Sequence, residues 1–171
     1  EGVVEACEQA GITPAALGCI GIGAPGAVDP HRGIVLEAVN LRWNDVALAD
    51  LMTKRLKVRT FLDNDVNVAV YGEWKLGAGK GVNNLLGVWL GTGIGGGMIL
   101  NGGLYYGQFF TAGEIGHTIL FPNMPRGMRS FEHACSRTAV VDRLARLLKA
   151  NAKSKLSAEV GNDYEKIKSR T

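Results

Sequence analysis

The sequence GTGIGGG spans Gly91–Gly97 and lies between the apolar runs Leu85–Leu90 and Met98–Leu100. Five of its seven residues are glycine, so the backbone can approach a ligand closely and turn amide N–H groups toward it. The hydroxyl of Thr92 adds another hydrogen-bonding group. This stretch is therefore a candidate phosphate-binding loop.

The same stretch contains the pattern GxGxxG at Gly91, Gly93 and Gly96, which is typical of dinucleotide-binding loops. That pattern requires a helix directly after the glycines. Here Met98–Leu100 follows, and then Asn101–Gly102, which is a strong signal for a tight hairpin turn. We therefore predict a strand, a glycine turn and a second strand. A hairpin that binds no ligand is the alternative that the glycines alone leave open.

The composition is that of a globular protein. The chain has 171 residues, of which 46% are hydrophobic, and a net charge of +3, which suits one domain or two small lobes. No apolar run approaches the roughly 20 residues of a membrane span, and no signal segment opens the chain. The basic runs 149–155 and 166–170 favour solvated helix faces over a nucleic-acid groove, because no aromatic platform accompanies them. We expect a cytoplasmic protein with neither a membrane nor a nucleic-acid partner.

Three cysteines, Cys7, Cys19 and Cys135, are widely spaced and form no CxxC pair. This pattern argues against a disulfide framework and fits a reducing compartment. The chain begins at Glu1 without a methionine, and we expect it to be a fragment of a longer protein.

The first part of the chain alternates expected helices and strands, which is typical of an α/β fold. The patterns predict a helix over Val3–Ala10, a buried strand over Leu17–Gly23, a turn leading into Ile34–Leu36, a helix from Val46 to Leu56 capped by Asn44 or Asp45, and a strand over Val58–Leu62.

Polar residues gather at Asp63–Asn67, between that last strand and a predicted helix over Val66–Leu76. One of these side chains is expected to cap the helix. Four Asp and Asn residues exceed what a cap requires, and α/β folds bind ligands just past the carboxyl ends of their strands. The cluster is therefore also a candidate site.

The glycine-rich segment Gly77–Asn84 predicts a boundary between two lobes, residues 1–76 and residues 77–171. The first lobe would carry the Asp63–Asn67 cluster, and the second would carry the glycine loop.

In the second lobe, Glu114 and His117 lie three residues apart in the glycine-flanked stretch GEIGH, a spacing that lets both face one ligand. A helix is predicted over Phe131–Leu148, with Glu132 near its start, where an acid also favours the helix dipole. Its predicted buried stripe consists of Val140, Val141, Leu144, Leu147 and Leu148.

Five motifs follow one another along the chain: GAPGAVD (Gly23–Asp29), DNDVN (Asp63–Asn67), GEW (Gly72–Trp74), GTGIGGG and GEIGH. This ordered set strongly resembles the ROK family of repressors, open reading frames and sugar kinases, over roughly Leu17 to Arg143. The resemblance implies an actin-like, ribonuclease H-like ATPase fold of the α/β class, with two lobes and a cleft.

The resemblance also implies roles for individual residues. Asp65 matches the base that accepts the proton of the sugar hydroxyl, and Asn64 matches a residue that helps to hold the sugar. Glu114 and His117 match the sugar-binding acid and histidine of GEIGH, and Glu132 matches a later sugar-binding acid.

The glycine stretch resembles the second phosphate motif of the superfamily. By this resemblance Gly91, Thr92, Gly93 and Gly95 bind the phosphates of ATP, with Mg²⁺ sharing the charge. The family's first phosphate motif and its late adenosine contacts are absent from the chain, which truncation explains.

One departure from the family concerns zinc. Many ROK proteins carry a CxCGxxGC segment after GEIGH, whose cysteines join the histidine in binding structural zinc. Here the interval 118–131 contains no cysteine, and Cys135 alone cannot complete the four protein ligands of such a site. We therefore expect no protein-bound metal, and we expect His117 to be available to the sugar.

The resemblance implies an ATP-dependent hexose kinase, with glucose as the first candidate and N-acetylmannosamine, N-acetylglucosamine and fructose as others. The alternative is the sugar-binding domain of a ROK repressor, which binds the ligand without chemistry. A non-sugar actin-like ATPase would leave GEIGH without a purpose. ROK proteins are often dimers or tetramers, so a homo-oligomer is also implied.

Overall fold

The computed structural model describes residues 1–150 and 154–160 of the chain. The basic run 166–170, for which a solvated helix face is predicted, lies outside the described residues. No helix among the described residues is long and apolar enough to cross a membrane.

The chain divides into two compact units. The first consists of Glu1–Gly87 and Gly97–Gly113, and the second of Val88–Gly96 and Glu114–Thr171. This division differs from the predicted lobes, because the tip of the glycine hairpin belongs to the second unit while its two ends belong to the first. The lobe boundary after residue 76 stays a prediction.

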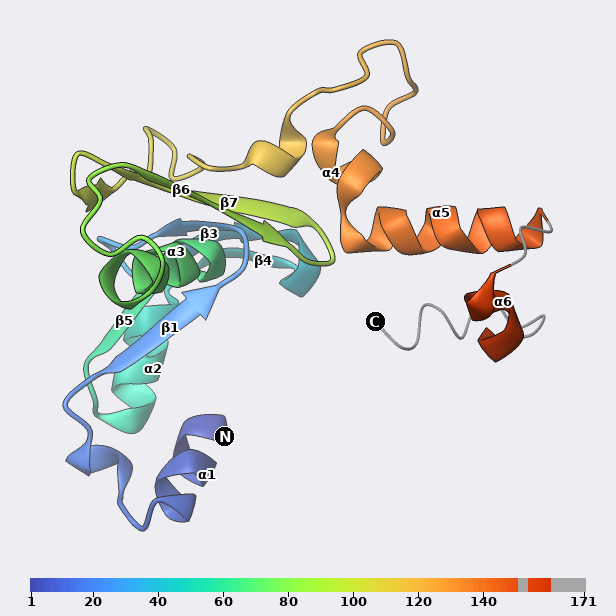
Figure 1. Cartoon of the computed structure of the whole chain (residues 1–171). Helices are drawn as coiled ribbons and strands as arrows, with labels where there is room; N and C mark the ends of the chain where they lie inside the picture. Colours follow the sequence, from blue (N-terminus) through green and yellow to red (C-terminus); the bar gives the residue numbers. More distant parts are fainter. Residues whose placement is uncertain (151–153, 161–171) are drawn as a thin grey trace. The chain divides into compact units, whose positions relative to one another are not determined.

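The first unit follows the predicted α/β order (Figure 1). Its elements up to the polar cluster are α1 (Gly2–Gln9), β1 (Ile20–Ala24), β2 (Ala27–Asp29), β3 (Ile34–Ala38), β4 (Trp43–Val46), α2 (Leu48–Leu56), β5 (Thr60–Asn64) and α3 (Asp65–Leu76). Two 3-10 turns, Pro14–Ala16 and Val39–Leu41, connect them. The strand predicted over Leu17–Gly23 begins later, at Ile20.

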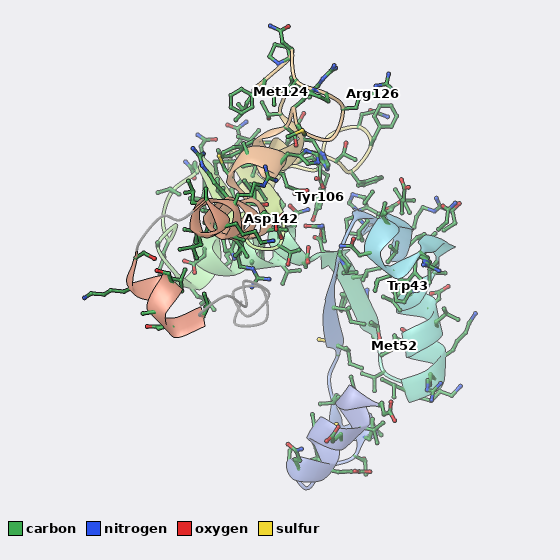
Figure 2. The ribbon with its side chains drawn as sticks, turned by 90° about the vertical axis from the view of Figure 1, so that its right-hand side faces the viewer. Trp43, Met52, Tyr106, Met124, Arg126 and Asp142 are labelled. Carbon is green, nitrogen blue, oxygen red and sulfur yellow. The ribbon has the colours of Figure 1, made fainter. Side chains whose placement is uncertain are left out.

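Strands β1 and β5 lie side by side and run parallel, with Ile22 opposite Leu62 and Gly23 opposite Asp63. Strands β2, β3 and β4 form an antiparallel sheet. Small and branched apolar side chains from these strands and α2 form the core of the unit: Ala24, Val28, Val35, Ala38, Ala49 and Leu62. Figure 2 shows Trp43, which packs against this core, and Met52 on α2.

The predicted capping of α2 by Asn44 or Asp45 is wrong. These two residues lie in β4, where Asn44 pairs with Glu37 of β3, and α2 begins only at Leu48. The residue before the helix is Ala47, which makes no side-chain capping bond. The cause is strand pairing: a short polar stretch at the edge of a sheet satisfies its backbone through β3 rather than through a helix.

The glycine stretch forms a hairpin, as predicted, but with a shorter turn. Strand β6 (Leu85–Leu90) is followed by β7 (Ile94–Leu100) and β8 (Gly103–Leu104), in that order within one sheet. The turn therefore comprises Gly91–Gly93, and the later glycines lie in β7.

The second unit also carries three helices among its described residues: α4 (Phe131–Cys135), α5 (Arg137–Lys149) and α6 (Lys155–Val160). A bridge between Ile119 and Ser130 closes the long loop before α4, on which Figure 2 labels Met124 and Arg126.

The single helix predicted over Phe131–Leu148 is wrong, because the chain breaks at Ser136. The backbone of Ser136 is extended, with ψ 162°, and its side chain accepts a hydrogen bond from the N–H of Ala139 at 3.2 Å. Ser136 thus caps α5 and separates it from α4.

The predicted buried stripe of this helix is correct only in part. The buried residues are Val141, Ala145 and Leu148, which pack with Val160 of α6. Val140, Leu144 and Leu147 are instead exposed by 48%, 39% and 52%.

Candidate functional site

The start of α3 is built by Asn64, the last residue of β5. Its Oδ1 accepts hydrogen bonds from the N–H groups of Val66 at 2.9 Å and Asn67 at 3.0 Å, so it is the predicted cap. Its Nδ2 donates to the carbonyl of Gly26 at 3.0 Å. The side-chain oxygen of Asn64 is therefore used in capping the helix, and one of the two N–H groups of its amide remains for a ligand.

Asp65 is the first residue of α3, and it is exposed. Its Oδ1 accepts from the N–H of Val66 at 2.9 Å. Gly23 of β1 lies beside it: a Cβ at Gly23 would stand 3.1 Å from the Asp65 Cα. The carboxylate is therefore presented to solvent at the N-terminus of α3.

Asp63 gathers several groups around one carboxylate. Its Oδ1 accepts from the N–H of Asn64 at 2.7 Å and from Nδ2 of Asn67 at 3.3 Å. Its Oδ2 accepts from the hydroxyl of Tyr106 at 2.7 Å. Burial, and then the hydrogen bond to Asp63 and the charge of that carboxylate, raises the pKa of Tyr106 well above its ordinary value. The phenol therefore stays a hydrogen-bond donor at neutral pH.

In the second unit, the glycine turn is fastened to the start of α5. The N–H of Gly91 donates to the carbonyl of Gly93 at 2.9 Å, and the N–H of Arg137 donates to the carbonyl of Gly91 at 3.0 Å. The Thr92 carbonyl accepts from the hydroxyl of Thr138 at 2.9 Å. The turn is thus held in one conformation by its own hydrogen bond and by the first residues of a helix.

Thr92 also meets a positive charge. Nη2 of Arg137 donates to its Oγ1 at 3.1 Å, which leaves the hydroxyl proton of Thr92 available to a ligand. A guanidinium group beside a glycine turn favours an anion such as phosphate. Arg137 was not among the predicted site residues, since a lone arginine after a serine carries no signal of this contact.

Glu132, in α4, touches the same turn. Its Oε2 accepts from the N–H of Ile94 at 2.8 Å. A Cβ at Gly93 would lie 2.3 Å from that oxygen, so Gly93 provides the space for the carboxylate. The other carboxylate oxygen can accept from a sugar hydroxyl.

Glu114 directly precedes the 3-10 turn Ile115–His117, and His117 is the last residue of that turn. His117 Nε2 lies 3.7 Å from Glu114 Oε2, and the two side chains are 71% and 45% exposed. Between them, Gly116 packs so closely that a Cβ there would meet the Ile94 carbonyl oxygen at 2.2 Å and Glu132 Oε2 at 3.3 Å. The GEIGH turn, Glu132 and the glycine turn therefore meet within one unit.

A cavity of about 280 Å³ adjoins this group, with Thr92, Glu132 and His133 in its lining. A larger cavity of about 660 Å³ is lined by residues of α1 and α2 and contains none of the predicted site residues. Of the predicted site residues, Thr92 and Glu132 line the smaller cavity.

Each unit contains some of the predicted site residues. Asn64 and Asp65 lie in the first, with Asp63 and Tyr106, which were not predicted as site residues. The second holds Glu114, His117, Glu132, Gly91, Thr92, Gly93 and Gly95, the last of these within β7. In the described part of the chain, no three His, Cys, Asp or Glu side chains come together as a metal ion would require.

Comparisons with known proteins agree with one family. The family model described as "ROK family" matches residues 1–167. A glucokinase from Halalkalibacterium halodurans is 36% identical over 148 residues, which cover 86% of this chain and 45% of the relative. The xylose repressor of Bacillus subtilis is 37% identical over 114 residues, which cover 67% of this chain and 29% of the repressor.

Among solved structures, a ROK family glucokinase from Streptomyces griseus, in complex with glucose and AMPPNP, matches with a TM-score of 0.76 and 33% identity. The match covers 97% of this chain and 56% of that one. The fold is thus the actin-like ATPase fold of the α/β class. The chain spans less than half the length of the two curated relatives above.

Proposed function

This chain belongs to the ROK family, and from that premise we propose that the protein is an ATP-dependent sugar kinase that phosphorylates a hexose, with glucose as the first candidate. One observation carries the proposal: the carboxylate of Glu132 lies against the glycine turn and beside Gly116 of GEIGH. Groups suited to a sugar and groups suited to a phosphate therefore adjoin one another.

The proposed sugar ligands are Glu114, His117 and Glu132, together with the remaining amide N–H of Asn64. Carboxylates and imidazole bind sugar hydroxyls by accepting or donating hydrogen bonds. The exposure of Glu114 and His117 supports this role, because both side chains can reach a ligand.

The proposed phosphate site consists of Gly91, Thr92, Gly93 and Gly95, with Arg137 adding a positive charge. The N–H of Gly91 is bonded to the Gly93 carbonyl, so Gly91 would shape the turn while other backbone N–H groups of the site donate to the phosphate. Such N–H groups and a guanidinium group in fixed positions stabilise the charge that develops on a transferring phosphoryl group. ATP would arrive with Mg²⁺ on its phosphates, so the ion is part of the donor substrate.

Asp65 is the proposed base. It would accept the proton of the sugar hydroxyl while the hydroxyl oxygen bonds to the γ-phosphorus and the bond from that phosphorus to the bridging oxygen breaks. The products are a sugar phosphate and ADP. Because the transition state is loose, the positioning of the sugar hydroxyl contributes more to the rate than the removal of its proton.

The second candidate is the sugar-binding domain of a ROK repressor, which is favoured by the 37% identity to the xylose repressor of Bacillus subtilis. The same acids would then hold a sugar without phosphoryl transfer.

An ADP-release assay on the full-length protein tests the proposal, with ATP, Mg²⁺ and a panel of glucose, N-acetylmannosamine, N-acetylglucosamine, fructose and xylose. We expect sugar-dependent release that is highest with glucose. Sugar binding in calorimetry without ADP release from any member of the panel would reject the kinase and favour the repressor.

A further inference from the structure

Tyr106, which Figure 2 labels, lies in the segment after β8 and is bonded to Asp63 near the end of β5, within the first unit. Its hydroxyl donates to Asp63 Oδ2 at 2.7 Å. Its ring lies against those of His31 and Phe110, with centroids 6.0 Å and 6.2 Å away. The ring contacts hold the phenol in place, so the hydroxyl is aimed at one carboxylate.

Asp63 is also bonded to two residues at the first turn of α3. Its other oxygen accepts from the N–H of Asn64 and from Nδ2 of Asn67. Because a carboxylate can only accept hydrogen bonds, the amide nitrogen of Asn67 must face it, and the orientation of that side chain is fixed. Asn67 is only 5% exposed, so it has little freedom to adopt another position.

Asp65 lies between the two residues that Asp63 holds. Asn64 is bound through its backbone N–H and Asn67 through its side chain, and the two are also joined by the bond from the Asn67 N–H to Asn64 Oδ1. The backbone of Asp65 has to follow this turn. A displacement of about 1 Å in a catalytic group can lower a rate by about 100-fold.

We propose that Tyr106 is a positioning residue: by holding Asp63, its hydroxyl fixes the Asn64–Asn67 turn and therefore the carboxylate of Asp65. This inference rests on the proposed function, in which Asp65 accepts the proton of the sugar. Asn64 is also held by the bond from its own side chain to the Gly26 carbonyl, so the loss of the Tyr106 hydroxyl should act mainly on Asp65. We therefore expect it to lower kcat and to leave the affinity for glucose nearly unchanged.

The test is Tyr106→Phe in the full-length protein, which removes the hydroxyl and keeps the ring. We expect kcat to fall about 10-fold while KM for glucose stays within about 2-fold, as for an interaction that acts on the transition state. Tyr105→Phe is the matched control, because the neighbouring ring is 47% exposed, and its kcat should equal that of the wild type.

The same substitution is then made in Asp65→Asn. If Tyr106 acts through the Asp65 carboxylate, Tyr106→Phe should cause no further loss of kcat in that background. A purely structural role would give the same fold-loss in both backgrounds. That outcome, or an unchanged kcat in Tyr106→Phe alone, would overturn the inference.

Amide hydrogen exchange separates this inference from the proposed function. In Tyr106→Phe, the amides of Val66 and Asn67 should exchange faster than in Tyr105→Phe, because their turn is less constrained. Equal exchange would overturn the role of Tyr106 even in an active kinase. A wild-type protein that releases no ADP would overturn the proposed kinase, and the exchange rates would still decide whether Tyr106 fixes the turn.

Discussion

The carboxylate of Glu132 and the backbone N–H of Ile94 are joined by a hydrogen bond of 2.8 Å. Ile94 is the first residue of β7, directly after the glycine turn, and Glu132 lies in α4. The bond therefore ties a proposed sugar ligand to the proposed phosphate turn. A substitution in the glycine turn should therefore alter sugar binding by Glu132, and a substitution of Glu132 should alter the glycine turn.

Gly93→Ala tests this link. The new Cβ would lie 2.3 Å from Glu132 Oε2, so the carboxylate must move away and the N–H of Ile94 loses its acceptor. We expect a loss of about 1–3 kcal/mol in the free energy of unfolding, as for a broken hydrogen bond to a charged group. We also expect a raised KM for the sugar. Urea denaturation and steady-state kinetics measure these two effects.

Gly91→Ala is the control for stability. A Cβ at Gly91 has its nearest neighbour, the Gly93 carbonyl oxygen, 4.0 Å away, so the urea midpoint should not move. Equal losses in both variants would mean that the turn needs glycine for its backbone and not for Glu132.

The tight turn between β7 and β8 could be predicted from the sequence, since Asn101–Gly102 marks such a turn through local chemistry alone. The contact between Glu132 and Ile94 could not, because it joins residues far apart in the chain and depends on how α4 packs. Only the resemblance to a family indicated a role for Glu132, and it gave no partner within the fold.

Asp65→Asn tests the proposed base. Asn keeps the size of the side chain and can still accept from the N–H of Val66, but it cannot take up the sugar proton. We expect kcat to fall by about 10²- to 10⁴-fold, the contribution typical of a general base, with glucose binding retained in calorimetry. Turnover close to that of the wild type would remove Asp65 from this role.

The ends of the helices show that a capping residue in the sequence does not by itself determine where a helix begins. The sequence predicts that one residue of the Asp63–Asn67 cluster caps α3, and the cap is Asn64, the last residue of the parallel strand β5. Asn44 and Asp45 carry the same local signal, yet pairing with β3 takes their backbone into a strand. Ser136 lies inside an apolar pattern that suits a continuous helix, and only its extended backbone separates α4 from α5. The same residue types therefore have different outcomes, set by tertiary contacts.

Gly97→Ala should destabilise the first unit. A Cβ there would lie 2.8 Å from Val70 Cγ2 and 3.1 Å from Asn67 Oδ1, and both neighbours are buried. Overpacking of this kind costs about 1–3 kcal/mol, which urea denaturation would detect. Gly72→Ala is the contrasting variant in α3: nothing lies within 4 Å of its Cβ, so it should instead stabilise by up to about 1 kcal/mol. Equal changes in the free energy of unfolding for Gly97→Ala and Gly72→Ala would show that β7 leaves room for a methyl group beside α3.

The hydrogen bond from Tyr106 to Asp63 should be visible in the pH dependence of stability. Burial, and then the bond to Asp63 and the charge on it, raises the pKa of Tyr106 above the value of 10.0 that it has in an unfolded chain. The folded state therefore holds this proton more tightly than the unfolded state does. The contribution of Tyr106 to stability is complete below pH 10 and declines as the pH rises further, because the unfolded chain then gains free energy by ionising.

We expect the free energy of unfolding of the wild type to exceed that of Tyr106→Phe by a constant amount between about pH 7 and pH 9, well below the ordinary tyrosine pKa. The difference should shrink above pH 10, and urea denaturation at a series of pH values measures it. Other titrating groups cancel in the comparison, because both proteins contain them. A difference that stays constant or grows up to about pH 11 would mean that the Tyr106 hydroxyl is not held by the Asp63 carboxylate in the folded protein.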